Sequence, residues 1–202
     1  MKNGEKDQVY KSYNKIADWY TQHRSQELFE QPYLDLIINN LNTEAEVLDL
    51  GCGTGEPIAR YFSGKGFKVT GVDGSQKLID IARSKLPDIK FLIADMRTIN
   101  LNLKYDAIIA WNSYFHLPKN DQRRMFDIFE NHVKPGGMLI FTSGPDEGEV
   151  WSDNGGIDLY HASLSSGEYR RLAKEHSFKV IKHAIEDKEC GSATIWIMQY
   201  RG

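Results

Sequence analysis

The chain has 202 residues, of which 41% are hydrophobic and 26% charged, the balance of an ordinary globular domain. Its net charge of −3 gives no reason to expect nucleic acid or an anionic membrane as a partner. Two cysteines are too few for a disulfide framework, and the first residues lack an apolar signal segment, so we expect a cytoplasmic protein. No repeat or linker divides the sequence, which predicts one domain, 1–202.

The first forty or so residues predict helices. Ile16, Trp19, Tyr20 and His23 recur at helical spacing, and a second amphipathic segment follows Pro32.

Beyond residue 45, short apolar runs alternate with helical segments. Runs that are rich in Val, Ile and Leu on successive positions suit strands buried on both faces, and their alternation with helices predicts a parallel sheet. The runs are EVLDL, FKVTGVD, IKFLIAD, YDAIIAW and GMLIFTS.

The last part of the chain predicts a different pairing. FKVIKHAIED and SATIWIMQY flank the turn KECG and indicate a hairpin, so one late strand runs antiparallel. The predicted fold class is therefore α/β, with a doubly wound, mostly parallel sheet that carries an antiparallel edge pair. Such sheets bind ligands beyond the carboxyl ends of their strands, where the strand order reverses.

The stretch VLDLGCGTGEP places Gly51, Gly53 and Gly55 directly after the first predicted strand. Bare backbone allows a ligand to approach closely, although a tight turn that binds nothing would look similar. The dinucleotide fingerprint needs Gly or Ala where this chain has Glu56, whose charge would oppose a pyrophosphate, and no P-loop Lys-Ser or Lys-Thr pair follows.

Asp73, in GVDGS, can accept both hydroxyls of a ribose, or cap a helix. Together these features favour a nucleoside without phosphates.

In this order the motifs resemble those of the class I S-adenosylmethionine-dependent methyltransferases. The resemblance rests on VLDLGCGTGEP, GVDGS, FLIADM, YDAIIAWNSYFHL and VKPGGMLIF, and it covers nearly the whole chain. It implies a Rossmann-like methyltransferase fold of seven strands, the last of them antiparallel. It also implies an N-terminal helical lid (1–42) on a core (43–202), with S-adenosyl-L-methionine as cofactor and S-adenosyl-L-homocysteine as product.

The resemblance further implies a role for each matched residue. Asp49 would face the amino group of the cofactor, and Asp73 would bind the ribose hydroxyls. Asp95 would accept the adenine amino group, and Arg24 would pair with the cofactor carboxylate. The remaining implied cofactor contacts are Tyr13, Tyr20, Gly51, Cys52, Gly53, Gly55, Gly74, Leu78, Met96, Trp111 and Asn112.

The function implied is methyl transfer to a nucleophilic atom of a small-molecule acceptor, by in-line displacement in a largely desolvated cleft. His116 is the candidate general base, although the resemblance also allows it a structural place in its loop. Residues 143–166 read as a long polar loop that selects the substrate, so its Trp151 and Tyr160 are candidate substrate contacts. Tyr114, among the aromatic residues after the fourth predicted strand that are expected to rim the cleft, is a third. We expect no metal, no membrane and no nucleic acid, and either a monomer or a homodimer.

Other functions stay open at this point. One is a protein that binds S-adenosylmethionine or S-adenosylhomocysteine without transferring a methyl group, and another is a nicotinamide oxidoreductase. A third is methylation of protein or nucleic acid, although AWNS stands where many nucleic-acid amino methylases carry an NPPY-type motif.

Overall fold

The computed structural model describes residues 4–25 and 27–202, so residues 1–3 and 26 of the predicted lid lie outside the described residues. The strands are β1 (Glu46–Leu50), β2 (Lys68–Asp73), β3 (Lys90–Ile93), β4 (Tyr105–Ala110), β5 (Val133–Ser143), β6 (Gly148–Asn154), β7 (Ile157–Ser163), β8 (Phe178–Asp187) and β9 (Ala193–Tyr200). The helices are α1 (Val9–Lys15), α2 (Ala17–His23), α3 (Gln31–Ile38), α4 (Ile58–Gly64), α5 (Gln76–Lys85), α6 (Lys119–His132) and α7 (Ser166–Glu175), with short 3-10 helices η1 (Tyr114–His116) and η2 (Lys188–Cys190).

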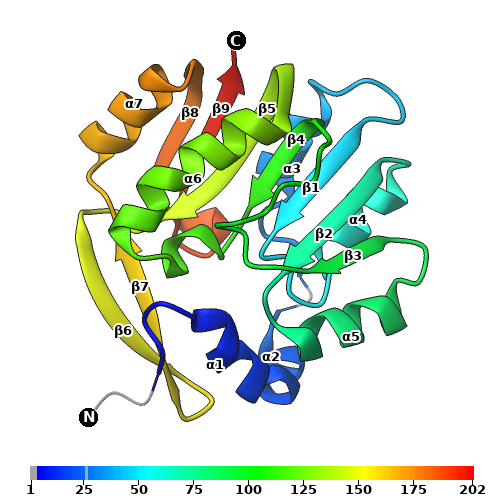
Figure 1. Cartoon of the computed structure of the whole chain (residues 1–202), viewed down its shortest axis with the longest axis vertical. Helices are drawn as coiled ribbons and strands as arrows, with labels where there is room; N and C mark the ends of the chain where they lie inside the picture. Colours follow the sequence, from blue (N-terminus) through cyan, green and yellow to red (C-terminus); the bar gives the residue numbers. More distant parts are fainter. Residues whose placement is uncertain (1–3, 26) are drawn as a thin grey trace.

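Seven strands form one sheet in the order β3-β2-β1-β4-β5-β9-β8. Strands β1 to β5 pair in parallel, and β9 is antiparallel to both β5 and β8. The predicted seven-stranded sheet with an antiparallel last strand is confirmed, with β9 between β5 and β8 and β8 at the edge (Figure 1). The order reverses between β1 and β4, which places a binding crevice at the carboxyl ends of these strands.

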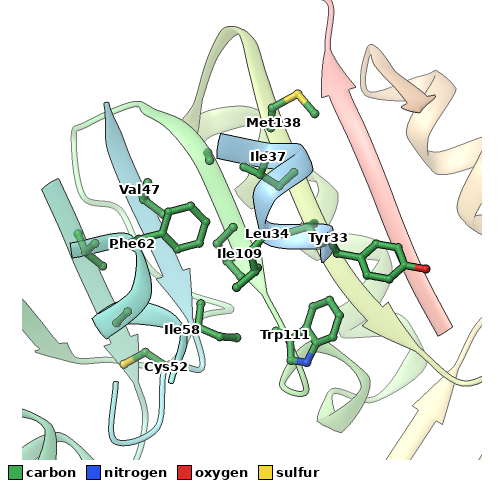
Figure 2. Close-up of a cluster of buried hydrophobic side chains, with 14 of the residues drawn as sticks. Tyr33, Leu34, Ile37, Val47, Cys52, Ile58, Phe62, Ile109, Trp111 and Met138 are labelled. Carbon is green, nitrogen blue, oxygen red and sulfur yellow. The ribbon is translucent and has the colours of Figure 1, made fainter. Parts of the chain in front are cut away.

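The sheet is buried on both faces because successive strand residues are apolar. Val47 and Leu48 are both fully buried, yet they belong to different core clusters on opposite faces. One face is covered by α3, α4 and α5, and the other by α6 and α7 (Figure 1). Figure 2 shows the first cluster, in which Tyr33, Leu34 and Ile37 of α3 pack on the sheet. Helix α3, which lies within the predicted lid (1–42), therefore packs as part of the core.

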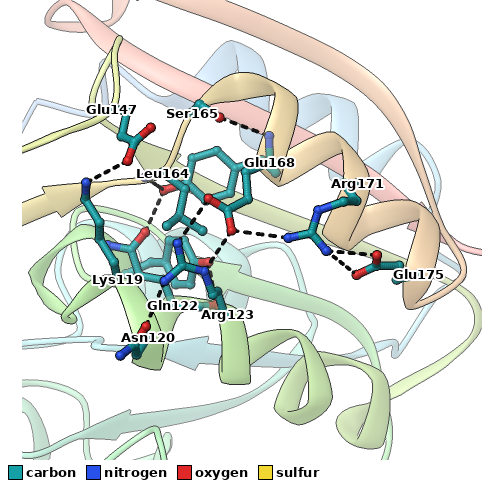
Figure 3. Close-up of polar contacts among 12 residues, drawn as sticks. Lys119, Asn120, Gln122, Arg123, Glu147, Leu164, Ser165, Glu168, Arg171 and Glu175 are labelled. Carbon is teal, nitrogen blue, oxygen red and sulfur yellow. Dashed lines mark hydrogen bonds and ion pairs between the residues drawn. The ribbon is translucent and has the colours of Figure 1, made fainter.

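A buried glutamine connects α6 to the segments around the crevice. The Gln122 side chain donates hydrogen bonds of 2.9 Å to the carbonyls of Leu117, after η1, and Ala162, in β7. It accepts one of 2.6 Å from the Tyr169 hydroxyl of α7. Nearby, Arg123 pairs with Glu168 at 2.7 Å, which joins α6 to α7 (Figure 3). Because buried polar groups must be paired, this network fixes η1 and β7 relative to the core.

Residues 143–166 differ from the predicted loop, because most of them form the antiparallel hairpin β6–β7. Two glycines with positive φ, Gly155 and Gly156, make its two-residue turn. Trp151 and Tyr160 face each other across the strands, with ring centroids 5.3 Å apart, and pack near Val9 of α1. The hairpin therefore supports the first helix.

Within residues 4–25 and 27–202, no helix has both the length and the apolar character needed to cross a bilayer.

Candidate functional site

A cavity of about 890 Å³ lies at the carboxyl ends of β1, β2 and β4 and beneath α1 and α2. Its position is the crevice that the strand order predicts. All the residues that the sequence assigned to the cofactor line this cavity except Gly55, and His116 lines it as well. The structure therefore brings residues of four separate motifs together with residues of the N-terminal helices.

Gly51 shows why the floor of the cavity is bare backbone. Its φ is +74°, a left-handed conformation that favours glycine. A Cβ atom here would lie 2.2 Å from Cβ of Ser113, whose hydroxyl donates a 2.6 Å hydrogen bond to the Leu50 carbonyl. The loop and the segment after β4 are thus in contact without room for one more carbon.

We expect Gly51→Ala to destabilise the fold by about 2 kcal/mol or more and to weaken ligand binding, because the loop must move away from Ser113 and adopt a strained φ. Gly64→Ala is the matched control, since nothing lies within 4 Å of its Cβ position at the end of α4. Urea unfolding of both variants measures the difference. Equal stabilities would contradict the tight contact.

Two other residues of the glycine turn have packing roles. A Cβ on Gly55 would lie 2.7 Å from the Phe91 ring, so this glycine makes room for the core rather than for a ligand. The Cys52 thiol is buried, and burial raises its pKa well above the ordinary value. A protonated thiol in this position is a poor nucleophile.

Two carboxylates face the cavity, Asp49 buried and Asp73 half-buried. Asp73 accepts hydrogen bonds from the main-chain N–H groups of Gly53 (2.9 Å) and Ser75 (2.8 Å), and burial raises its pKa. Asp49 is 4% exposed, and burial, together with the charge of Asp73, raises its pKa to about 7. A buried carboxylate of this kind is stabilised by a cation or by hydroxyl donors from a ligand. These two acceptors thus suit a ligand that carries both a cationic group and hydroxyl donors.

The N-terminal helices form the opposite wall. The rings of Tyr13 and Tyr20 meet edge to face at 5.2 Å, and Arg24 lies 3.4 Å from Glu30. Tyr10 also lines the cavity and lies against Gly74, where a Cβ would be 2.6 Å from its ring. Sequence reasoning missed Tyr10, although its position three residues before Tyr13 places both rings on one helix face.

His116 is held by hydrogen bonds at both ring nitrogens. Nδ1 lies 2.8 Å from the Tyr160 carbonyl, which can only accept, so Nδ1 carries the proton. Nε2 then accepts the Tyr13 hydroxyl at 2.9 Å. Burial, with a smaller contribution from His161, lowers the pKa of His116 to about 3. This geometry favours a neutral histidine that joins α1 to β7 over a general base.

We expect His116→Ala to destabilise the protein by roughly 2–3 kcal/mol, because a buried carbonyl and a buried hydroxyl lose their partner and a cavity is left. Tyr13→Phe removes one hydrogen bond and should cost about 1 kcal/mol. Chemical denaturation at pH 7 measures both. Wild-type stability of His116→Ala would argue against the structural connection.

A second cavity, of about 800 Å³, adjoins the first and shares Arg24, Trp111 and Asn112 with it. The ends of β4 and β5 and the turn between η2 and β9 line the rest. Asn112 has φ +49°, and its N–H donates to the Thr142 hydroxyl at 2.8 Å. Strained, hydrogen-bonded positions of this kind recur at ligand sites.

The three predicted substrate residues line neither cavity. Tyr114, the first residue of η1, is fully buried, and its hydroxyl donates to the Gln122 carbonyl at 2.8 Å. Trp151 and Tyr160 pack between the hairpin and α1. The sequence showed aromatic residues near the cleft but not the direction in which they point.

Comparison with known proteins gives one family match and several relatives. The family model described as a methyltransferase domain matches residues 47–137. A Bacillus subtilis protein named provisionally as a methyltransferase is 35% identical over 135 residues, which are 64% of this chain and 54% of the relative. The malonyl-[acyl-carrier protein] O-methyltransferase of Salmonella typhimurium is 29% identical over 68% of this chain and 54% of its own length. The chain thus spans about half the length of these curated relatives.

Solved structures share the fold at lower identity. The CcbJ methyltransferase of Streptomyces caelestis superimposes with a TM-score of 0.77 at 16% identity, covering 98% of this chain and all of the other. A Burkholderia thailandensis 1,6-didemethyltoxoflavin-N1-methyltransferase, solved with its acceptor and S-adenosylhomocysteine, gives a TM-score of 0.75 at 14% identity over 96% of this chain and 88% of its own.

Proposed function

Because this chain belongs to the class I S-adenosylmethionine-dependent methyltransferases, we propose that it transfers the methyl group of S-adenosylmethionine to a small-molecule acceptor. The observation that carries the proposal is a pair of carboxylates, the buried Asp49 and the half-buried Asp73, which line one cavity with the bare backbone of the glycine turn. They offer acceptors for a ribose and a charge for an ammonium group, and nearby Arg24 can take a carboxylate. S-adenosylmethionine carries all three groups.

Each end of the first cavity suits one part of the cofactor. Asp49 and Arg24 would hold its amino acid end, and Asp73 would hold the ribose hydroxyls. The side chain of Asp95 would accept a hydrogen bond from the adenine amino group, and the main-chain N–H of Met96 would face the ring. Gly74 and Leu78 line the same end as Asp95.

The second cavity is the proposed acceptor site. It shares Trp111 and Asn112 with the first, so an acceptor there would meet the methionine end of the cofactor. Thr142, Ser143 and Thr194 line it, together with the aromatic residues Phe29, Trp111 and Phe115. Relatives named as dTDP-amino-sugar N,N-dimethyltransferases and as a ubiquinone biosynthesis O-methyltransferase suggest a small acceptor.

The chain's contribution to the reaction is chiefly positioning. Bound S-adenosylmethionine supplies a methyl group on a sulfonium, which already has a good leaving group. Tyr13, Tyr20 and Trp111 exclude water from the cavity and present aromatic rings, which stabilise a cation. Holding both reactants in adjoining cavities lowers the entropic cost of in-line attack. His116 acts by keeping Tyr13 in the wall rather than by removing a proton.

The helices within residues 1–42 would act as the lid of this site, because α1 and α2 cover the first cavity. Contacts between α1 and both α5 and β7 hold them there: the Asn14 side chain accepts a 2.9 Å hydrogen bond from the Lys77 N–H. The proposed location is the cytoplasm, where the two buried free thiols, Cys52 and Cys190, would stay reduced.

Calorimetric titration of the purified chain with S-adenosylhomocysteine and with NAD tests the cofactor. We expect saturable binding of the first compound alone, and the reverse result would identify an oxidoreductase. Incubation with methyl-labelled S-adenosylmethionine and a metabolite extract then tests transfer. Label in the filtrate supports a small acceptor, label in precipitated protein or nucleic acid identifies a macromolecular one, and binding without transfer identifies a binding protein.

A further inference from the structure

Asp95 and Arg97 form a closely paired unit at one end of the first cavity, and both line it. Nε of Arg97 donates to Oδ1 (2.9 Å) and Oδ2 (3.0 Å) of Asp95, and Nη2 donates to Oδ2 (2.5 Å). The main-chain N–H of Arg97 donates to Oδ1 as well, at 3.0 Å. Both carboxylate oxygens are therefore held by one residue, through a rigid planar guanidinium.

A second acid holds the guanidinium from the other side. Nη1 of Arg97 donates to Oδ2 of Asp121, in α6, at 2.7 Å. The side chains of Arg97 and Asp121 are 21% and 20% exposed, so the pair is screened less than a surface ion pair. Helix α6 thus fixes the orientation of Arg97, and Arg97 fixes that of Asp95.

The pairing determines what Asp95 can recognise. A carboxylate has about four acceptor positions, whereas Arg97 supplies three N–H groups, of which Nε–H is shared between the two oxygens, so one position of Asp95 remains for a further hydrogen bond. Burial opposes ionisation of Asp95, but the Arg97 hydrogen bonds outweigh it and hold the pKa of Asp95 below its ordinary value. An ionised carboxylate accepts and cannot donate, so it binds an amino group and repels a carbonyl oxygen.

We propose that Arg97 is a positioning residue for base recognition: it holds Asp95 as a fixed acceptor for the exocyclic amino group of adenine. The inference rests on the proposed function, which places adenine at this end of the cavity. Arg97 itself need not touch the ligand. Its effect is a preference for adenine over a base that carries a carbonyl in place of the amino group.

The test compares S-adenosylhomocysteine with S-inosylhomocysteine, in which a carbonyl replaces the amino group, by calorimetric titration. We expect the wild-type chain to prefer the adenine compound by about tenfold or more. Arg97→Met should weaken adenine binding about tenfold and leave inosine binding unchanged, which removes the preference. Arg97→Lys, with its charge but no planar fork, should retain part of it.

Arg124→Met is the matched control, because Arg124 pairs with the same Asp121 at 3.7 Å and is 80% exposed. It should keep the full preference. If Arg97→Met has a lowered melting temperature, Asp121→Asn serves as the second variant. It loosens the Arg97 guanidinium without altering Asp95 and should also reduce the preference for adenine. An unchanged preference in Arg97→Met, or equal binding of both compounds by the wild type, overturns this inference but leaves the cofactor site intact. Binding of neither compound overturns the proposed function itself.

Discussion

Asp73→Ala is expected to weaken binding of S-adenosylhomocysteine by about 100-fold or more. The carboxylate would accept two ribose hydroxyls, and each hydrogen bond to a charged group contributes roughly 1.5–3 kcal/mol. Asp73 is already oriented for this role, because the N–H groups of Gly53 and Ser75 hold one oxygen each. Isothermal calorimetry of the two proteins measures the loss.

A ligand variant separates the ribose contact from damage to the glycine turn. The wild-type chain should bind the 2′-deoxy analogue of S-adenosylhomocysteine more weakly than the parent compound. Asp73→Ala should bind the two compounds alike, because changes to interacting partners are not additive. If the hydroxyl matters as much in the variant as in the wild type, Asp73 does not bind it.

Asp49→Asn is expected to make the free protein more stable and its ligand binding weaker. Burial and the charge of Asp73 raise the folded-state pKa of Asp49 to about 7, above the ordinary value of 3.8. The folded state therefore binds the Asp49 proton more tightly than the unfolded state does. The resulting contribution to the free energy of unfolding is fully present below pH 4 and is lost as the pH rises through 7. At pH 8 the neutral asparagine avoids a penalty of roughly 2–4 kcal/mol.

The same substitution should reduce affinity for S-adenosylhomocysteine at pH 8 by about 10–100-fold, because the ligand's ammonium group loses its charged partner. Wild-type affinity should rise between pH 5 and pH 8 as Asp49 ionises, and that of the variant should stay flat. Thermal melts and titrations across this range measure both effects. The exposed Asp88→Asn is the control and should change neither. If Asp49→Asn is less stable than the wild type at pH 8, the raised pKa of Asp49 is contradicted.

The positions of the sheet strands and of the glycine turn could be predicted because their signals are local. Val47 and Leu48, apolar on successive residues, identify a strand buried on both faces, and Gly51 and Asp73 follow at the strand ends where ligands bind. The places of these residues in the sheet follow from the order of strands and helices along the chain.

Side-chain directions could not be predicted, because they depend on how distant segments meet. Tyr160 looked like a substrate contact, yet the pairing of β6 with β7 directs it against α1. The orientation of Arg97 could not be predicted, because its contact with Asp121, 24 residues away, depends on where α6 packs. In the sequence, the charge of Glu56 is expected to oppose a pyrophosphate. In the structure, Arg60 and Lys85 pair with this carboxylate at 2.6 and 2.5 Å.

Strand β9 enters the sheet between β5 and β8, although it is made after both. A chain emerging from the ribosome can therefore assemble β1 to β5 while the outer edge of β5, with Ile140 and Phe141, still lacks its neighbour. An open edge of this kind invites pairing with another nascent chain. Translational stalling before Ala193–Tyr200 appear would leave that edge of the unfinished chain unprotected.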